Sequence, residues 1–261
     1  MTEGIAPMSD GCPIAWRLDG PEDAPLLLLS NSLGTTMDMW APQLAAFTAR
    51  YRVLRYDSRG HGHSGAPKGD YSVDRLGRDA VELLDKLDIA TTYFCGLSLG
   101  GMVGQWLGVN QPERIGRLII ANSSAYMGPP SAWRDRIALV RAHGMAAIAD
   151  AVTERWFTPE FRAASPHAVD AIRTMLLTTQ PDGYCGACAA IAEMDMRPLL
   201  PRIAPPALVI GGLRDPATPP DHARALAAGI DGSQLVELPA AHLSNCELPE
   251  RFTEAVTGFL A

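Results

Sequence analysis

The sequence predicts an α/β fold, a mostly parallel sheet flanked by helices, with a helical cap inserted late in the chain. Short apolar runs typical of buried strands alternate with longer amphipathic stretches. That alternation stops between Ala121 and Pro205, where helical spacing replaces it. With 261 residues, the chain is long enough for one large domain that carries such an insertion.

Six short apolar segments are predicted to form strands. Four consecutive leucines, residues 26–29, indicate a strand that is buried on both faces. Residues 73–87 and 102–110 have the apolar spacing of helices, which fits the crossovers between parallel strands. The other predicted strands are residues 52–56, 92–95, 118–121, 208–210 and 235–238.

The inserted segment shows helical periodicity interrupted by prolines. We expect residues 123–203 to form a helical cap over the sheet, and residues 1–122 and 204–261 to form the core. The periodic stretches are residues 137–140, 147–156 and 168–177.

Charge and hydropathy exclude several classes of partner. The net charge of −7 argues against binding to nucleic acid or to an anionic membrane, since both need basic surface. No apolar run approaches the roughly 18–20 residues that span a bilayer, and the first residues lack the features of a secretory signal. The oligomeric state is not readable from the sequence.

The cysteines are five in number and scattered, which suits a reducing cytoplasm better than a disulfide framework. Cys185 and Cys188 have CxxC spacing, but no second pair of ligands completes a zinc site. We therefore expect no metal, and we interpret this pair as small residues within a helix.

Gly96-Leu-Ser98-Leu-Gly100 follows a predicted strand and precedes a predicted helix. In a G-x-S-x-G turn the serine lies on a tight, strained bend that lifts its hydroxyl above the sheet, and the flanking positions have no room for a side chain. This context predicts that Ser98 is a nucleophile in an α/β-hydrolase fold.

A serine nucleophile needs a general base, and the base an orienting acid. In this fold the chain order is serine, acid, histidine. His242 lies in a loop after the last predicted strand, and Asp215 directly follows residues 208–210. Some members of this fold place the acid one strand earlier, but in this chain that position holds Asn122, which has no carboxylate. Asp221 is the nearest competitor, but we expect it to cap a helix.

Two backbone N–H groups are needed to stabilise the oxyanion. One should belong to Leu99, the residue after the nucleophile, and the other to Leu33 in the loop after the early leucine strand.

Five motifs resemble those of the 3-oxoadipate enol-lactonases, which are α/β-hydrolases of the β-ketoadipate pathway of aromatic catabolism. The resemblance runs from about Ile14 to the end of the chain and is weakest in the cap. It implies the same triad, and it implies a structural turn for His61 and His63. The motifs are residues 31–35 (NSLGT), 57–64 (DSRGHGHS), 96–101 (GLSLGG), 211–215 (GGLRD) and 241–245 (AHLSN).

The resemblance implies hydrolysis of 3-oxoadipate enol-lactone to 3-oxoadipate through an acyl-enzyme, with no cofactor. The lactone carries a free carboxylate, so a basic side chain should face the pocket. Arg134 is our candidate for that contact, although a solvated arginine is the plainer interpretation. Trp133 or Trp156 would supply an apolar wall.

Other functions use the same residues. A carboxylesterase, a cofactor-free haloperoxidase and a C–C bond hydrolase all remain open, and a substrate panel would separate them. A hydrolase-fold ligand receptor is a further alternative, since receptors can keep the triad.

Overall fold

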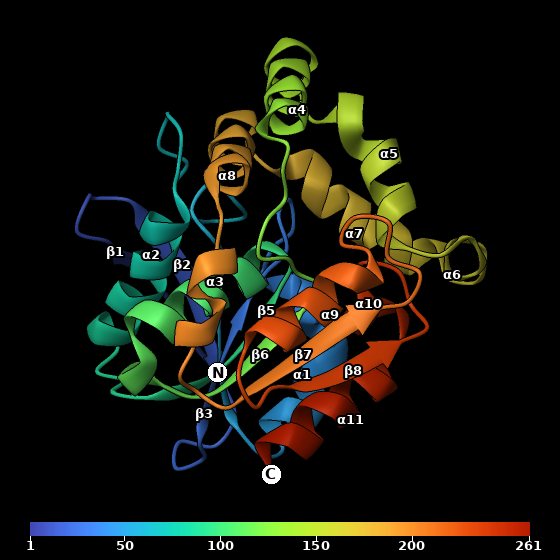
Figure 1. Cartoon of the computed structure of the whole chain (residues 1–261). Helices are drawn as coiled ribbons and strands as arrows, with labels where there is room; N and C mark the ends of the chain where they lie inside the picture. The colour runs from blue at the N-terminus through green and yellow to red at the C-terminus, as the bar shows by residue number, and fades with distance from the viewer.

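The computed structural model describes residues 1–261 and contains one eight-stranded sheet, in the order β1-β2-β4-β3-β5-β6-β7-β8 (Figure 1). β2 pairs antiparallel with β1 and β4, and all other neighbours are parallel. The predicted mostly parallel sheet is confirmed. The strands are β1 (Thr2–Pro7), β2 (Pro13–Asp19), β3 (Leu26–Ser30), β4 (Arg52–Tyr56), β5 (Thr92–Leu97), β6 (Ile115–Ala121), β7 (Ala207–Gly212) and β8 (Gln234–Leu238).

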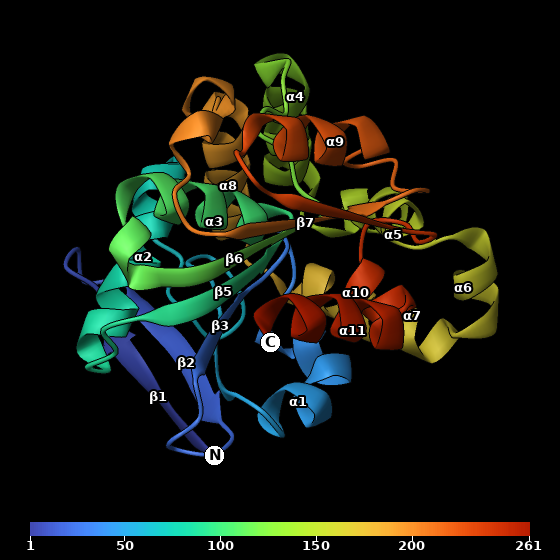
Figure 2. The same cartoon turned by 60° about the horizontal axis from the view of Figure 1, so that its bottom comes forward.

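Helices cover both faces of the sheet (Figure 2). α1 and α11 pack together on one face, whereas α3 and α9 lie on the other, with α2 packed against α3. Because both faces are covered, Leu27, Leu28 and Leu29 of β3 are completely buried, as the leucine run predicts. These helices are α1 (Ala41–Thr48), α2 (Val73–Lys86), α3 (Leu99–Asn110), α9 (Pro220–Gly229) and α11 (Pro249–Leu260).

Five further helices, which we call the cap helices, fill the connection between β6 and β7 and lie over the carboxyl ends of the parallel strands (Figure 1). Most of the prolines that interrupt the periodicity begin helices. Proline is tolerated at the first position of a helix because an N–H there would have no partner within the helix. The predicted helical character is confirmed, while the division into cap and core at residues 123 and 203 stays a prediction. The cap helices are α4 (Pro130–His143), α5 (Ala146–Trp156), α6 (Pro159–Ala164), α7 (Pro166–Thr178) and α8 (Pro181–Glu193).

The two ends of the inserted segment are joined to each other. Tyr126 and Asp195 form an isolated antiparallel bridge, and the Met196 N–H donates to the Ala125 carbonyl at 2.8 Å. Short helical turns complete the chain: η1 (Met37–Trp40), η2 (Pro112–Arg114), η3 (Arg197–Arg202) and α10 (Ser244–Glu247).

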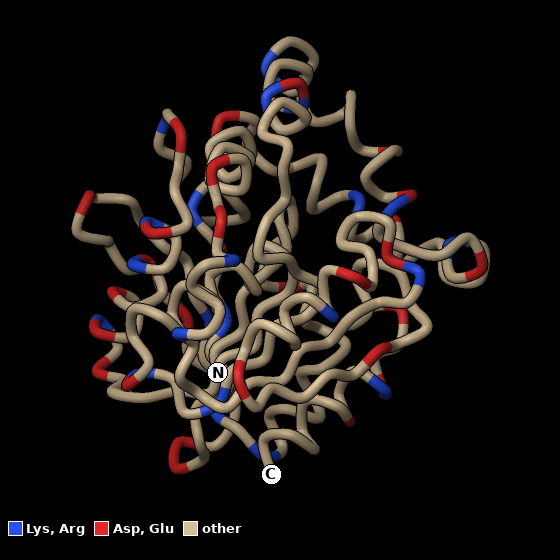
Figure 3. Tube along the Cα trace, in the orientation of Figure 1, with Lys and Arg blue, Asp and Glu red and all other residues tan.

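Cys185 and Cys188 lie buried in α8 as free thiols, which agrees with their structural interpretation. No group of three or more His, Cys, Asp or Glu side chains is placed to hold a metal ion. None of the helices has the length and apolar character needed to cross a membrane. Basic and acidic residues are interspersed along the trace in Figure 3 rather than gathered by sign.

Candidate active site

Ser98 forms the turn between β5 and α3 and has φ 57° and ψ −113°. This backbone conformation is unfavourable for a residue with a side chain, as expected of a strained nucleophile turn. A Cβ at Gly96 would overlap the Gly100 carbonyl, and a Cβ at Gly100 would overlap the Ser30 carbonyl. Only glycine fits at either flank, which confirms the steric reason for the motif.

His242 and Asp215 meet at the carboxyl ends of β8 and β7. The imidazole Nδ1 lies 2.8 Å from Asp215 Oδ2, and both side chains are buried. An ionised carboxylate only accepts hydrogen bonds, so Nδ1 carries the proton and donates it. Nε2 is then left with the lone pair that a general base needs.

The acid is held by several donors besides the imidazole. The N–H groups of Ala217 and Thr218 donate to Asp215 Oδ1 at 2.8 and 2.9 Å, and the Thr218 hydroxyl donates to Oδ2 at 2.7 Å. Burial alone would raise the pKa of Asp215. The charge and hydrogen bond of His242, together with the bonds from Thr218, outweigh burial and leave that pKa lowered. The carboxylate is therefore ionised when it orients His242.

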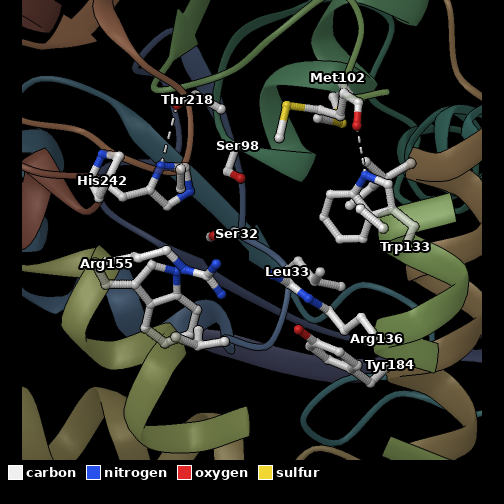
Figure 4. A pocket seen from close by; sticks show the side chains of 17 residues that line it. Ser32, Leu33, Ser98, Met102, Trp133, Arg136, Arg155, Tyr184, Thr218 and His242 are labelled. Atoms are coloured by element: carbon white, nitrogen blue, oxygen red, sulfur yellow. Dashed lines mark hydrogen bonds between the residues drawn. The ribbon is translucent and has the colours of Figure 1, made fainter. Parts of the chain in front are cut away.

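Ser98 and His242 line the same cavity, which has a volume of about 230 Å³ (Figure 4). No hydrogen bond joins the Ser98 hydroxyl to the imidazole in this structure. Such contacts are often long in enzymes without substrate and tighten on binding. The structure thus brings the three predicted triad residues to one edge of the sheet, and their catalytic roles stay a prediction.

Leu33 and Leu99 are both buried beside Ser98, and Leu33 lines the cavity. Leu99 is the first residue of α3, so its N–H has no partner within the helix. The Leu33 N–H likewise donates to no acceptor in the chain, whereas the next N–H, of Gly34, donates to His61 Nε2 at 2.9 Å. Two unpaired donors next to a nucleophile fit the predicted oxyanion site.

His61 lies outside the cavity and is wholly engaged by backbone. Its Nε2 accepts from Gly34, and its Nδ1 donates to the Arg59 carbonyl at 3.1 Å. This arrangement agrees with the structural turn implied by the resemblance. Because Nε2 must accept, the contact requires the neutral imidazole.

Acid is expected to destabilise the fold through His61. Burial lowers the pKa of His61 from 6.5 to about 4, so between these pH values the folded state binds fewer protons than the unfolded state. The stability contributed by this group is complete above pH 6.5 and is lost as the pH falls toward 4, by up to about 3 kcal/mol.

Urea unfolding of wild type and His61→Gln between pH 7 and 4 measures this effect. Glutamine accepts and donates hydrogen bonds without titrating, so the variant should lose less free energy of unfolding on acidification. Equal losses in the two proteins would assign the acid sensitivity to other groups.

The cap helices supply the far wall of the cavity. Trp133 of α4 lines it, as predicted, and so does Trp156 of α5. Arg134 does not: its side chain is 70% exposed and faces Glu193 at 3.6 Å, so its prediction as the pocket cation is wrong. The cause is helical phase, because Arg134 is one residue, about 100° of rotation, from Trp133.

Arg136 and Arg155 are the cations that face the cavity (Figure 4). Neither forms an ion pair within the chain, and the Arg136 guanidinium lies 4.8 Å from the centroid of the Trp133 ring. Burial first, and then the positive charge of Arg136, lower the pKa of Arg155. Two partly buried cations that repel each other and lack a counter-ion create a site for an anion.

Asn122 is a residue of the site whose role the sequence did not indicate. Its Nδ2 donates to Asp215 Oδ2 at 3.1 Å and to the Ala241 carbonyl at 3.2 Å, while its Oδ1 accepts from the Ser244 hydroxyl at 2.6 Å. It therefore ties the acid to the segment that carries His242.

Asp221, the competing acid, is exposed and pairs with Arg224 at 3.0 Å. It lies in the first turn of α9, whose N-cap is Pro219, so the prediction that Asp221 caps this helix is wrong. The proline preceding the helix occupies the cap position instead.

Comparison with known proteins bears on the fold and the family of this chain. A family model described as alpha/beta hydrolase fold matches residues 25–163. The chain is 45% identical to 3-oxoadipate enol-lactonase 2 of Acinetobacter baylyi over 91% of this chain and 89% of the relative. It is also 37% identical to enol-lactonase 1 of that organism, over 96% and 94%.

A solved enol-lactonase from Burkholderia xenovorans matches with a TM-score of 0.97 and 45% identity, over 98% of this chain and 99% of that one. A hydrolase from Pseudomonas aeruginosa gives the same TM-score with 47% identity, over 99% and 98%. Both matches extend over the cap helices as well as the sheet. The protein is an ester hydrolase, and the chain belongs to the 3-oxoadipate enol-lactonase family of α/β-hydrolases.

Proposed function

We propose that this protein hydrolyses 3-oxoadipate enol-lactone to 3-oxoadipate in the β-ketoadipate pathway of aromatic catabolism. One observation carries the proposal: two arginines without ionic partners face the same cavity as Ser98 and His242. A neutral ester would leave both charges unpaired, whereas a lactone with a carboxylate arm pairs with them. The two relatives named as enol-lactonases support the same substrate.

In the first half-reaction the Ser98 hydroxyl attacks the lactone carbonyl while His242 Nε2 takes its proton. The N–H groups of Leu33 and Leu99 stabilise the negative charge that forms on the carbonyl oxygen. The ring C–O bond then breaks, and the enol oxygen leaves with the proton from His242. The released enol tautomerises to the ketone, which makes the step favourable.

In the second half-reaction water attacks the acyl carbon while His242 takes a proton from it. The Ser98 oxygen leaves and recovers that proton, and the product carries a new carboxylate. Asp215 remains ionised throughout and stabilises the imidazolium in both steps. No step needs a metal or an organic cofactor.

Arg136 and Arg155 would bind the carboxylate arm of the lactone, and the indole rings of Trp133 and Trp156 would contact its ring. Each guanidinium offers a planar set of donors that matches a carboxylate. A bound anion would also offset the repulsion between the two arginines. That relief would add to the direct attraction between the carboxylate and each guanidinium.

A cytoplasmic setting fits the state of the cysteines. Four of the five are buried, and all five are free thiols in the structure. Cytoplasmic thiols are kept reduced, so no disulfide is required for stability. In the cytoplasm the protein would encounter the enol-lactone in the compartment where catabolic intermediates are produced.

Steady-state kinetics tests the proposal. The purified protein should hydrolyse the enol-lactone with a kcat/KM at least about 100-fold above that for the same lactone with methyl in place of its carboxymethyl arm. Phenyl esters of short acids serve as a second neutral comparison. A preference for the neutral lactone or for the phenyl esters would favour a carboxylesterase and would reject the enol-lactone.

A further inference from the structure

Two buried hydroxyl groups lie behind the candidate oxyanion site, one behind each donor. The Thr35 hydroxyl donates to the Ser32 carbonyl at 2.8 Å, and the Ser123 hydroxyl donates to the Ser98 carbonyl at 2.8 Å. We propose that Thr35 and Ser123 are positioning residues that aim the two oxyanion donors. This inference rests on the acyl-enzyme mechanism of the proposed function.

The first donor belongs to the peptide between Ser32 and Leu33. In a trans peptide the C=O and N–H bonds point in opposite directions, so a fixed carbonyl fixes the N–H. The Ser32 carbonyl accepts both from the Thr35 hydroxyl and from the Thr35 N–H, at 3.2 Å. The Leu33 N–H therefore points away from Thr35, and both Ser32 and Leu33 line the cavity.

The second donor belongs to the peptide between Ser98 and Leu99. Its carbonyl accepts from the Ser123 hydroxyl and from the Met102 N–H, at 3.0 Å. Ser123 follows β6, which lies beside β5 in the sheet, so a neighbouring strand supplies this contact. The Leu99 N–H points in the opposite direction, away from Ser123.

Both hydroxyl groups are out of contact with water. Thr35 is 0% and Ser123 is 1% exposed, so neither bond is exchanged for one to solvent. The Thr35 oxygen also lies 3.0 Å from Met39 Sδ, but a carbonyl oxygen is a stronger acceptor than a thioether sulfur. Each hydroxyl hydrogen is therefore directed at an oxyanion peptide.

These bonds act in two ways. They hold the N–H groups in place before the negative charge develops, so no reorganisation is needed in the transition state. They also polarise the peptides, since a bond to a carbonyl strengthens the N–H of the same amide as a donor by roughly 10–30%. Both effects favour the tetrahedral intermediate over the bound substrate.

Thr35→Val and Ser123→Ala remove the hydroxyls with little change in shape. We expect each to lower kcat about tenfold and both together by about 50-fold or more, with KM within about twofold of wild type. Thr35→Ser keeps the hydroxyl and should stay within about threefold of the wild-type kcat. Thr92→Val is the matched control, because Thr92 is buried at the start of β5, at the opposite end of this strand from Ser98, and its hydroxyl also donates to a backbone carbonyl, that of Tyr93 at 2.6 Å.

A boronic acid separates positioning from general stability. Phenylboronic acid forms a tetrahedral adduct with a reactive serine and places an oxygen at the oxyanion site, so its Kd should rise about tenfold in Thr35→Val and Ser123→Ala. The Kd for the product 3-oxoadipate, whose carboxylate carbons are trigonal rather than tetrahedral, should change less than twofold. A loss of kcat no larger than that of Thr92→Val, or an unchanged boronate Kd, would overturn the inference.

The outcome is independent of the substrate. If wild type hydrolyses phenyl acetate but not the enol-lactone, the proposed substrate fails, while the same variants still test the positioning role on the ester. If wild type hydrolyses the lactone and both variants match the control, the positioning role fails and the proposed function stands.

Discussion

Ser98→Ala is expected to lower kcat by about 10⁴- to 10⁶-fold, the range found when a triad nucleophile is removed. The reason is chemical, because alanine has no oxygen to form the acyl-enzyme. The backbone at Ser98 and the flanking glycines should keep their arrangement, so the variant should fold and still bind the lactone. Steady-state rates with the enol-lactone, together with circular dichroism and product binding, check this.

His242→Ala should lose nearly as much activity, and the double variant little more than either single one. Residues that act as a unit in one step give such non-additive losses. Ser233→Ala, in a loop far from the cavity, is the matched control and should retain wild-type turnover. Residual activity of Ser98→Ala within about tenfold of wild type would reject the nucleophile and with it the mechanism.

Replacing both pocket arginines is expected to produce the second-largest effect. Arg136→Met combined with Arg155→Met should lower kcat/KM for the enol-lactone by about 10²- to 10⁴-fold, since each bond to the substrate carboxylate contributes roughly 1.5–3 kcal/mol. Most of the loss should appear in KM. Hydrolysis of the methyl-substituted neutral lactone should change by less than about threefold, because that substrate offers no anion.

The control and the stability measurement sharpen this test. Arg134→Met is the matched control, since Arg134 lies on the same helix but faces solvent, and its KM should equal that of wild type. The double variant should unfold at a temperature no lower than wild type, because removing two mutually repelling cations relieves strain in the unliganded cavity. An equal loss on the charged and neutral lactones would assign the arginines to packing instead.

The sequence was informative where chemistry is local. The turn around Ser98 could be predicted because its glycines stand at fixed positions two residues before and after the serine. The contact that requires Gly96 lies within the turn, at the Gly100 carbonyl, whereas Gly100 is required by the Ser30 carbonyl of a neighbouring strand. Asp215 and His242 could be predicted because the carboxyl ends of parallel strands meet at one edge. Asn122 was missed because its contacts join two other loops, and nothing in its own neighbourhood indicates them.

Helical phase could have predicted which faces of α4 and α5 carry the two pocket arginines. Trp133, Ile137 and Val140 are the buried residues of α4, and Arg136 shares their face whereas Arg134 does not. Arg155 stands three residues after Val152, another residue that lines the cavity. Periodicity thus predicts which face a cation lies on, although it cannot predict that two such faces converge.

The two N-terminal strands were not predicted. β1 is an edge strand with mostly exposed residues and ends at Pro7, so it lacks the apolar run by which the central strands were recognised. β2 has buried residues, but its pattern is irregular along the strand. Their pairing with each other and with β4 depends on the rest of the sheet, which local patterns do not describe.

The conformation of Ser98 places the thermal stability of this chain in conflict with its catalytic activity. Its φ and ψ are those that glycine adopts in a type II′ turn, and a residue with a Cβ is held there at a cost of about 1–3 kcal/mol. A glycine at this position would relax the backbone and raise the melting temperature while removing the reactive oxygen. A screen that selects only for heat resistance would therefore enrich inactive protein, so thermostabilised versions of this enzyme must be selected for turnover at every round.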